Sequence, residues 1–398
     1  MSKPKTGQRT FSFQESVIRE MTRISEEAGA INLSQGLPDF SPPREIIEEA
    51  LQAIQKGDNQ YTFTFGSLAF RRAIAQKYAS ANQIHVNPET EVTVTCGASE
   101  ALMNAILGLT DPGDEVIIFE PWYENYVPDC LMAQAPIRLV DLHEPDYTFD
   151  PQELEAAVTP KTKLILVNTP HNPTGRVYSK KELQFISHLC QKYNLIAVCD
   201  ETYERILYDY HQHVSLGSLE GMEDRTVTIC GLGKSYSVTG WRIGWAVAAQ
   251  PLSTALRKVH DYLTVCAPSP FQSAGIAALG LDQSYYQKMR QQYAQRRKIL
   301  LQALDEAEIE YYKPEGAYYI MADFSSVEWD KDRYQGKGYS SDRAFAEFMA
   351  REIGVAVVPG SSFYMDQTKG TDKVRLNFSK KQATLQRAAE RLRKLRTK

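Results

Sequence analysis

The segment CGLGKSYSVTGWRIGW, residues 230–245, places a lysine in a glycine-rich turn directly after an apolar run. A phosphate-binding P-loop would need glycine in place of Thr228, and a dinucleotide-binding fingerprint would need glycine in place of Tyr236. Neither pattern fits. The remaining chemical interpretation is a Schiff-base nucleophile, Lys234, whose amine pKa is lowered by the nearby cation Arg242. The alternative is an ordinary solvated lysine in a loop.

Residues with complementary chemistry follow three other apolar runs. Asp200 and Tyr203 follow the run at 195–199, Asn172 lies in NTPHNPTG after the run at 162–167, and Ala98 and Ser99 follow the run at 91–96. Because ligands of open α/β sheets bind beyond the carboxyl ends of the strands, we expect one shared crevice.

Taken singly, each of these features has a simpler structural interpretation. The carboxylate could cap a turn, the serine could cap a helix, and the Asn-Pro pair could form a rigid turn. Free backbone N–H groups at a helix start also bind anions, however. The combination with Lys234 and Arg242 therefore favours a functional site.

Seven short runs rich in valine and isoleucine predict the strands that position these residues. Helical patterns such as SEALMNAILGL (99–109) and KKELQFISHLCQKY (180–193) alternate with them. This alternation predicts an α/β fold with a mostly parallel seven-stranded sheet sandwiched by helices. The predicted strands cover residues 91–97, 114–121, 135–142, 162–170, 195–203, 226–232 and 241–249.

The pattern changes towards both ends of the chain. Residues 46–285 contain the predicted sheet and form the large domain. Long charged helices and short strands follow, so residues 286–398 are predicted to form a smaller α+β domain. Residues 1–45, interrupted by prolines, are predicted to pack on that small domain.

Composition argues against several classes of protein. The chain has 45 Lys and Arg against 49 Asp and Glu, a formal charge of −4, which argues against a nucleic-acid surface. No segment approaches the roughly 18 apolar residues of a membrane span. Six widely spaced cysteines without a CxxC pair fit buried thiols, so we expect a cytoplasmic protein.

The pair of histidines in HQH, 211–213, could suggest a metal site. No further cluster of cysteines or carboxylates accompanies the pair in the sequence. We therefore expect a surface loop there and no metal.

Together the motifs resemble those of fold-type I, pyridoxal-phosphate-dependent aminotransferases of class I, over nearly the whole chain. HNPTG (171–175), DETYERI (200–206) and GKSYSVTGWRIGW (233–245) occur in the order and spacing of that family. Four further segments are most similar to the branch of kynurenine, glutamine and methionine aminotransferases: QGLPDF (35–40), YTFTFG (61–66), EPWYENY (120–126) and YDYHQHVSLGSLEGM (208–222).

The resemblance implies pyridoxal 5'-phosphate as cofactor and a role for each matching residue. Lys234 would bind the cofactor covalently and later move a proton between substrate and cofactor. Asp200 would face the pyridine nitrogen and keep it protonated. Tyr203 and Asn172 would donate hydrogen bonds to the ring hydroxyl oxygen, and Tyr123 would stack on the ring.

The resemblance also implies how the phosphate is held. Arg242 and the backbone amides of Ala98 and Ser99 would bind it. Tyr61 would reach the phosphate of the neighbouring subunit, which implies a homodimer with shared active sites. The chain departs from many relatives at Gly231, where they have a phosphate-binding serine.

Arg375 in VRLNFS matches the arginine that binds the substrate α-carboxylate in the family. Its planar fork of donors suits bidentate binding, and Asn172 and the backbone at Gly36 would approach the same carboxylate. Without the resemblance, Arg375 would be interpreted as a surface arginine at a strand edge.

The expected reaction is transfer of an amino group from an L-amino acid to a 2-oxo acid by a ping-pong mechanism. Aromatic residues, including Trp122, Tyr123, Tyr126 and Tyr318, favour aromatic, methionine or glutamine donors. Aspartate is the first alternative donor. Two other activities remain open: a cysteine-conjugate β-lyase, and a cofactor-binding regulatory module, against which the intact Lys234 argues.

Overall fold

A seven-stranded sheet forms the centre of the protein in this computed structural model, which describes residues 7, 15–335 and 340–395. The strands are β2 (Val92–Thr95), β3 (Glu115–Glu120), β4 (Ile137–Asp141), β5 (Thr162–Asn168), β6 (Ile196–Asp200), β7 (Thr226–Gly231) and β8 (Gly244–Ala248). Their order is β2-β8-β7-β6-β5-β3-β4. Only β8 is antiparallel to its neighbours, so the predicted mostly parallel sheet is confirmed.

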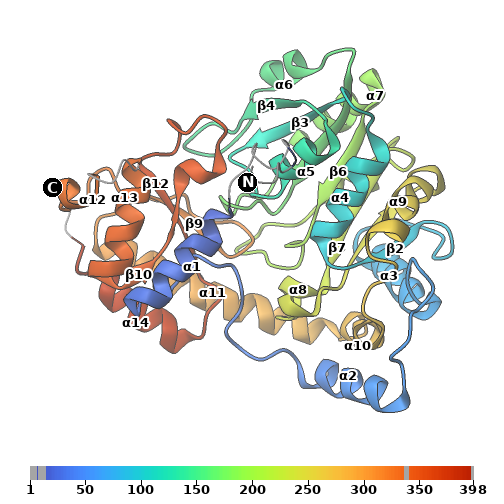
Figure 1. The fold of residues 1–398 in the computed structure, drawn as a ribbon, viewed down its shortest axis with the longest axis horizontal. Helices are drawn as coiled ribbons and strands as arrows, with labels where there is room; N and C mark the ends of the chain where they lie inside the picture. The colour runs from blue at the N-terminus through green and yellow to red at the C-terminus, as the bar shows by residue number, and fades with distance from the viewer. Residues whose placement is uncertain (1–6, 8–14, 336–339, 396–398) are drawn as a thin grey trace, which may run out of the picture.

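Helices cover both faces of the sheet (Figure 1). Val116 and Ile118 of β3 pack in the cluster that contains α4 (Ala98–Leu109) and α9 (Gln250–Leu263). Ile117 and Phe119 pack in the other cluster, with α7 (Lys180–Tyr193). Since alternate residues of a strand face opposite sides, a strand buried on both sides is apolar throughout, as the sequence showed.

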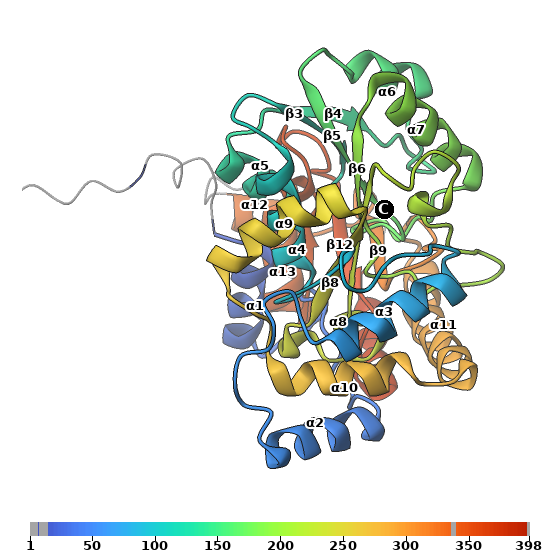
Figure 2. The same cartoon turned by 90° about the vertical axis from the view of Figure 1, so that its right-hand side faces the viewer.

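The remaining helices lie around these layers. They are α1 (Val17–Ala28), α2 (Arg44–Lys56), α3 (Leu68–Ala81), α5 (Tyr126–Ala133), α6 (Pro151–Ala157), α8 (Leu232–Ser235), α10 (Ser269–Leu279), α11 (Gln283–Glu306), α12 (Lys331–Gln335), α13 (Ser341–Phe348) and α14 (Gln382–Leu392). Short 3-10 or π turns occur at η2 (Leu216–Ser218), η3 (Thr239–Trp241), η4 (Met349–Ile353) and η5 (Gly360–Phe363). Figure 2 shows α2 and α10 packed side by side at the edge of the molecule.

A second, antiparallel sheet belongs to the C-terminal part of the chain. It has the order β11 (Val358–Pro359), β12 (Lys373–Asn377), β9 (Tyr319–Asp323). The N-terminal strand β1 (Ile31–Asn32) pairs in parallel with β10 (Val355–Ala356) beside it. The boundaries at residues 45 and 285 stay predictions, and residues 1–6 and 8–14 lie outside the described residues.

Asp129 on α5 gives the fold a testable pH dependence. Its side chain is buried, one oxygen has no hydrogen-bond partner, and burial raises the pKa of its carboxyl from 3.8 to about 7. Because the folded state binds this proton more tightly than the unfolded chain, the stabilisation is complete below pH 3.8 and is lost as pH rises through about 7. We expect Asp129→Asn to raise the free energy of unfolding at pH 8 by about 2–4 kcal/mol.

Urea denaturation at pH 8 and pH 5 checks this expectation. At pH 5 the folded carboxyl is protonated but the unfolded one is already ionised, so the variant should gain only about a third of its gain at pH 8. Asp111→Asn, at an exposed position, serves as the control and should leave the free energy of unfolding unchanged at both pH values. A gain from Asp129→Asn that is equal at both pH values would contradict the assignment.

Candidate active site

Lys234 lies on the short helix α8, which begins directly after the carboxyl end of the inner strand β7. Among the described residues its amine has no hydrogen bond or ion pair, although the side chain is only half-exposed. The nitrogen Nζ lies 5.6 Å from the ring centre of Tyr203 and 6.0 Å from that of Tyr318. An amine held among aromatic rings without a partner is available to react with a ligand.

A pocket surrounds Lys234, and most of the predicted site residues line it. They are Ala98, Ser99, Tyr123, Asn172, Asp200, Tyr203, Lys234 and Arg242. These residues come from segments after β2, β3, β5, β6 and β7 and before β8, so the strand ends converge as predicted. Gly36, Arg375 and Tyr61 are not part of this lining.

Asp200 provides a buried carboxylate at the end of β6. The hydroxyl of Tyr126 donates to its Oδ2 at 2.9 Å, and the backbone N–H of Thr202 donates to its Oδ1 at 3.2 Å. Burial raises the pKa of Asp200, whereas the bonds from Thr202 and Tyr126 and the charge of Lys234 act in the opposite direction. A buried carboxylate of this kind is stabilised further by a cationic group on a ligand.

The start of α4 and Arg242 form a cup that suits an anion. Gly97 precedes the helix with φ +82°, and no side chain in the described part of the chain caps it, so N–H groups at the helix start are available to a ligand. Arg242 has a left-handed backbone (φ +53°), and its Nη1 donates to the Thr239 carbonyl at 3.1 Å. Such strain in a non-glycine residue is typical of functional sites.

The glycine at position 231 follows from the close approach of β8. A Cβ there would lie 2.8 Å from the Ile243 carbonyl oxygen and 3.1 Å from the Gly244 Cα. Serine, the residue of many relatives, would therefore require a backbone shift in this chain. The anion cup depends instead on Arg242 and on the helix start.

Arg375 on β12 is fully buried at the side of the pocket. Its Nη1 donates to Asn172 Oδ1 at 2.8 Å, its Nη2 donates to the Ser34 carbonyl at 2.9 Å, and its Nε has no partner. No carboxylate of the described residues forms an ion pair with it. The alternative interpretation, a surface arginine at a strand edge, is thus excluded, and the buried charge is available to an anionic ligand.

Comparisons with known proteins agree with this geometry. A sequence profile described as "Aminotransferase class I and II" matches residues 28–392. The chain belongs to this family.

Individual relatives support the same conclusion. The chain is 35% identical to a kynurenine–oxoglutarate transaminase of Dictyostelium discoideum, over 98% of this chain and 97% of that one. It is 35% identical to a methionine aminotransferase of Escherichia coli, over 95% of each.

Solved structures match over almost the full chain. A structure of an Escherichia coli protein with a methionine aminotransferase function superposes with a TM-score of 0.92 at 34% identity, covering 98% of this chain and 100% of that one. An aspartate aminotransferase from Thermus thermophilus gives 0.89 at 30% identity, with the same coverage. The protein is therefore an enzyme that transfers amino groups between amino acids and 2-oxo acids. The lyase and regulatory-module alternatives are not favoured.

Sequence reasoning missed several residues of this aminotransferase that support the site. Tyr126 and Trp122, which the sequence named only among aromatic residues that favour the donor class, are buried, and the Tyr126 hydroxyl donates to Asp200. Tyr319 shares a hydrogen bond of 2.9 Å with Tyr203. The sequence signals no such pairs, because their members lie 74 and 116 residues apart.

The HQH segment differs from the expected surface loop. His211 is exposed, but the Nε2 of His213 lies 2.8 Å from Glu201, and that side chain is buried. Glu201, Glu204 and His213 bring their ligand atoms within 4.8 Å of one another. The ammonium of Lys77 is already paired with Glu204, so this cluster has its own cation.

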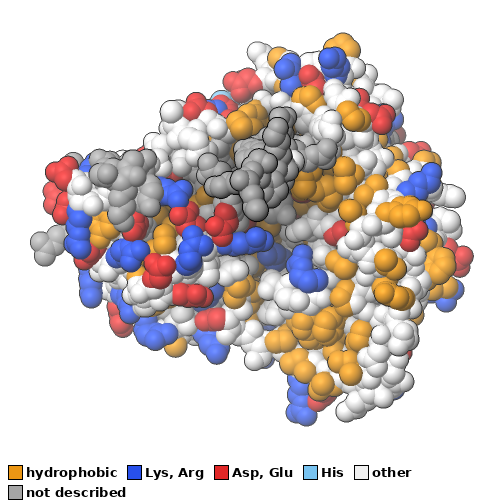
Figure 3. All heavy atoms as spheres, in the orientation of Figure 1, with side chains coloured by type: hydrophobic (Ala, Val, Ile, Leu, Met, Phe, Trp, Pro, Cys, Tyr) orange, Lys and Arg blue, Asp and Glu red, His pale blue; other side chains and the backbone are white. Residues whose placement is uncertain are grey.

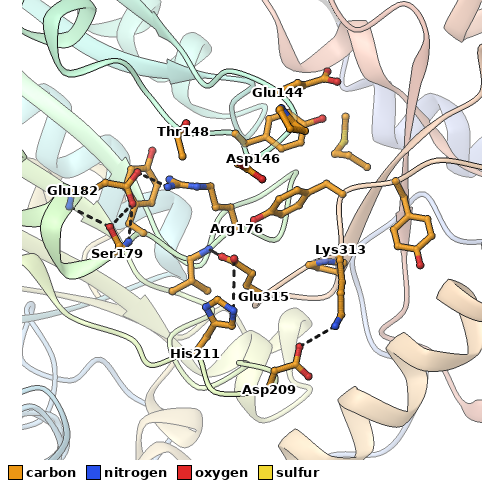
Figure 4. Close-up of a pocket in the computed structure, with 18 of the residues that line it drawn as sticks. Glu144, Asp146, Thr148, Arg176, Ser179, Glu182, Asp209, His211, Lys313 and Glu315 are labelled. Atoms are coloured by element: carbon orange, nitrogen blue, oxygen red, sulfur yellow. Dashed lines mark hydrogen bonds and ion pairs between the residues drawn. The ribbon is translucent and has the colours of Figure 1, made fainter.

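The 171–177 turn, which carries Asn172, also borders a larger groove of about 970 Å³. Figure 4 shows the ion pairs and hydrogen bonds along this groove. Glu315 accepts a hydrogen bond from the Val177 N–H at 2.9 Å and lies 3.6 Å from His211, while Lys313 pairs with Asp209 at 3.5 Å. The bond between Val177 and Glu315 fastens the end of this turn to the C-terminal part of the chain.

Gly244 allows a direct test of the anion cup. A Cβ at this position would lie less than 3 Å from backbone atoms of Gly97 and Ala98. We expect Gly244→Ala to displace the start of α4 and to weaken binding of added pyridoxal phosphate, the cofactor that the resemblance implies, more than tenfold, measured by fluorescence titration.

Gly240→Ala is the matched control, because nothing lies within 4 Å of the added Cβ. The affinity of the Gly240→Ala variant for pyridoxal phosphate should equal that of the parent enzyme. Both proteins are compared below their melting temperatures, and equal affinities for the two variants would contradict the role of the cup.

Proposed function

We propose that this aminotransferase uses pyridoxal 5'-phosphate bound at Lys234 and takes its amino group from an uncharged L-amino acid of the aromatic, methionine or glutamine type. One observation supports this proposal most directly. Among the described residues the amine of Lys234 has no hydrogen-bonding partner, and it shares the pocket with the Asp200 carboxylate and the anion cup at the start of α4. Pyridoxal phosphate has a complementary group for each of them: its aldehyde would react with the Lys234 amine, its ring nitrogen would face the Asp200 carboxylate, and its phosphate would bind in the anion cup.

When bound, pyridoxal phosphate supplies an aldehyde that condenses with amines and a ring that accepts electron density from the substrate Cα. The protein supplies the groups that hold and move protons. Asp200 holds a proton on the ring nitrogen through charge and hydrogen bonding. The Nζ of Lys234, once free, would take the proton from the substrate Cα and deliver it to the cofactor carbon that carried the aldehyde oxygen.

Arg375 is proposed to bind the substrate α-carboxylate. A buried guanidinium whose described partners are neutral gains most from an anion, and its fork of donors can bind both carboxylate oxygens. Bound in this way, the carboxylate would fix the orientation of the substrate relative to Lys234.

The charge of the pocket supports an uncharged side chain on the donor. In the described part of one chain, the cations that line the pocket are Lys234 and Arg242, and both have proposed partners on the cofactor. Relatives named for kynurenine and methionine favour the same class of donor. An aspartate donor, as in the Thermus thermophilus relative, is the competing candidate.

A homodimer with shared active sites is part of the proposal. Tyr61 is 80% exposed and Phe63 is 64% exposed, which is unusual for large aromatic side chains. Tyr262, Leu263 and Val265 are exposed as well, and Figure 3 shows hydrophobic side chains gathered over α2, α9 and α10. A second copy covering this face would bring its Tyr61 towards the anion cup.

The cytoplasmic location expected from the sequence stays a prediction. In residues 15–335 and 340–395 no helix combines the length and the apolar character of a membrane span.

The function is tested by labelling and by a substrate panel. Borohydride reduction of the holoenzyme should fix one cofactor on Lys234, identified by peptide mass spectrometry, and Lys234→Ala should lose both label and turnover. Half-reactions followed by absorbance should be rapid with phenylalanine, methionine or glutamine. A label elsewhere would refute the proposed cofactor site, and rapid reaction only with aspartate or glutamate would refute the donor class.

Arg375 is tested through the Michaelis constant of the amino donor. We expect Arg375→Lys to raise it about 10- to 100-fold, because the bidentate pair is lost. Arg296→Lys is the matched control: Arg296 is also buried with one unpartnered nitrogen, but it lies on α11 outside the pocket. An equal effect of both variants would refute the assignment.

A further inference from the structure

Tyr319 on β9 contacts three of the predicted site residues at once. Its hydroxyl shares a hydrogen bond of 2.9 Å with the hydroxyl of Tyr203, and its ring centre lies 4.3 Å from the Arg375 guanidinium carbon. A Cβ at Gly36 would overlap the Tyr319 hydroxyl. The side chain is buried, so this hydroxyl has little access to bulk water as an alternative partner.

The second sheet places Tyr319 beside Arg375. Arg375 of β12 lies opposite Met321 of β9, so Tyr319 is its diagonal neighbour on the same face of this sheet. Tyr203, in contrast, follows β6 of the large sheet. Tyr319 is therefore a direct contact between the carboxylate-binding arginine and the tyrosine beside Lys234.

The direction of the hydrogen bond between the two tyrosines decides whether Tyr203 can donate to a ligand. Each phenol has a single O–H donor but can accept as well. If Tyr203 donated to Tyr319, it would have no proton left for a ligand in the pocket. If Tyr319 donates to Tyr203, the Tyr203 proton is free to point into the pocket, and a phenol that accepts one bond becomes a stronger donor in the next.

We propose that Tyr319 is a positioning residue that donates to the Tyr203 oxygen, so that Tyr203 presents its own proton to the ring oxygen of the cofactor. This inference rests on the function proposed above. The aromatic ring of Tyr319 at the same time supports the Arg375 guanidinium. One side chain thus orients the donor to the cofactor and the clamp for the substrate carboxylate.

Tyr319→Phe separates these two contributions, because it removes the hydroxyl and keeps the ring. Tyr203 and the lysine-bound proton compete for the same ring oxygen, so a weaker Tyr203 bond lets that proton bind more tightly. We expect the midpoint of the pH titration of holoenzyme absorbance to rise by about half a pH unit, a threefold change in proton affinity. We expect kcat to fall about three- to tenfold while the KM of the amino donor changes less than twofold.

Tyr293→Phe is the matched control. Tyr293 is buried, its hydroxyl has no hydrogen-bond partner, and its ring stacks on Tyr318 at 5.8 Å. This variant also loses one buried hydroxyl but no hydrogen bond, so its absorbance titration and kcat should match those of the parent enzyme.

A double variant tests whether Tyr319 acts through Tyr203. The titration midpoint should shift by the same amount in the single variant Tyr203→Phe and in the double variant that also carries Tyr319→Phe. Without the Tyr203 hydroxyl, Tyr319 has no hydrogen bond to Tyr203 that its substitution could remove. Additive shifts, or an unchanged midpoint in Tyr319→Phe, would overturn the inference. Borohydride labelling of each variant distinguishes failure of this inference from failure of the proposed function. If Lys234 is labelled but the titration midpoint of Tyr319→Phe is unchanged, only this inference is refuted. If Lys234 is not labelled in the parent enzyme, the proposed function is refuted and the inference with it.

Discussion

The close approach of three backbone segments, at Gly97, Gly231 and Gly244, is the constraint on which the site depends. Strand β8 runs antiparallel between β7 and β2, and Gly244 is the register partner of both Gly231 and Thr95. The end of β7, the start of β8 and the end of β2 therefore meet at one edge of the sheet. Lys234, Arg242 and the free N–H groups of α4 surround the same pocket because these backbones touch.

Neutral partners keep the charges of the pocket available. Asp200 accepts from a tyrosine and a backbone N–H, and Arg375 donates to an amide and a backbone carbonyl. A carboxylate on Arg375 or an arginine on Asp200 would stabilise the empty protein but would compete with a charged ligand. The uncompensated charges are therefore best explained as binding energy reserved for ligands.

The sequence predicted the central sheet and most of the pocket because both depend on local patterns. Strands buried on both sides are apolar throughout, and chemistry-bearing residues lie at or directly after their ends, as Asp200 ends β6. Contacts between distant segments leave no such pattern. The Tyr126 bond to Asp200, the burial of His213 and the backbone contact that excludes serine at Gly231 depend on packing between elements that are separate in the sequence.

The N-terminal segment orients Arg375, the residue proposed to bind the substrate carboxylate, through its backbone. Leu33 accepts a hydrogen bond from the Asn377 N–H, and the Gln35 carbonyl accepts one from the Asn377 side chain. These bonds fasten the segment to β12, and they hold the Ser34 carbonyl at 2.9 Å from Arg375. A backbone carbonyl orients the guanidinium without neutralising it, which a side-chain carboxylate could not do. A segment more than 300 positions earlier in the sequence than β12 thus sets the orientation of the Arg375 guanidinium and places no opposite charge on it.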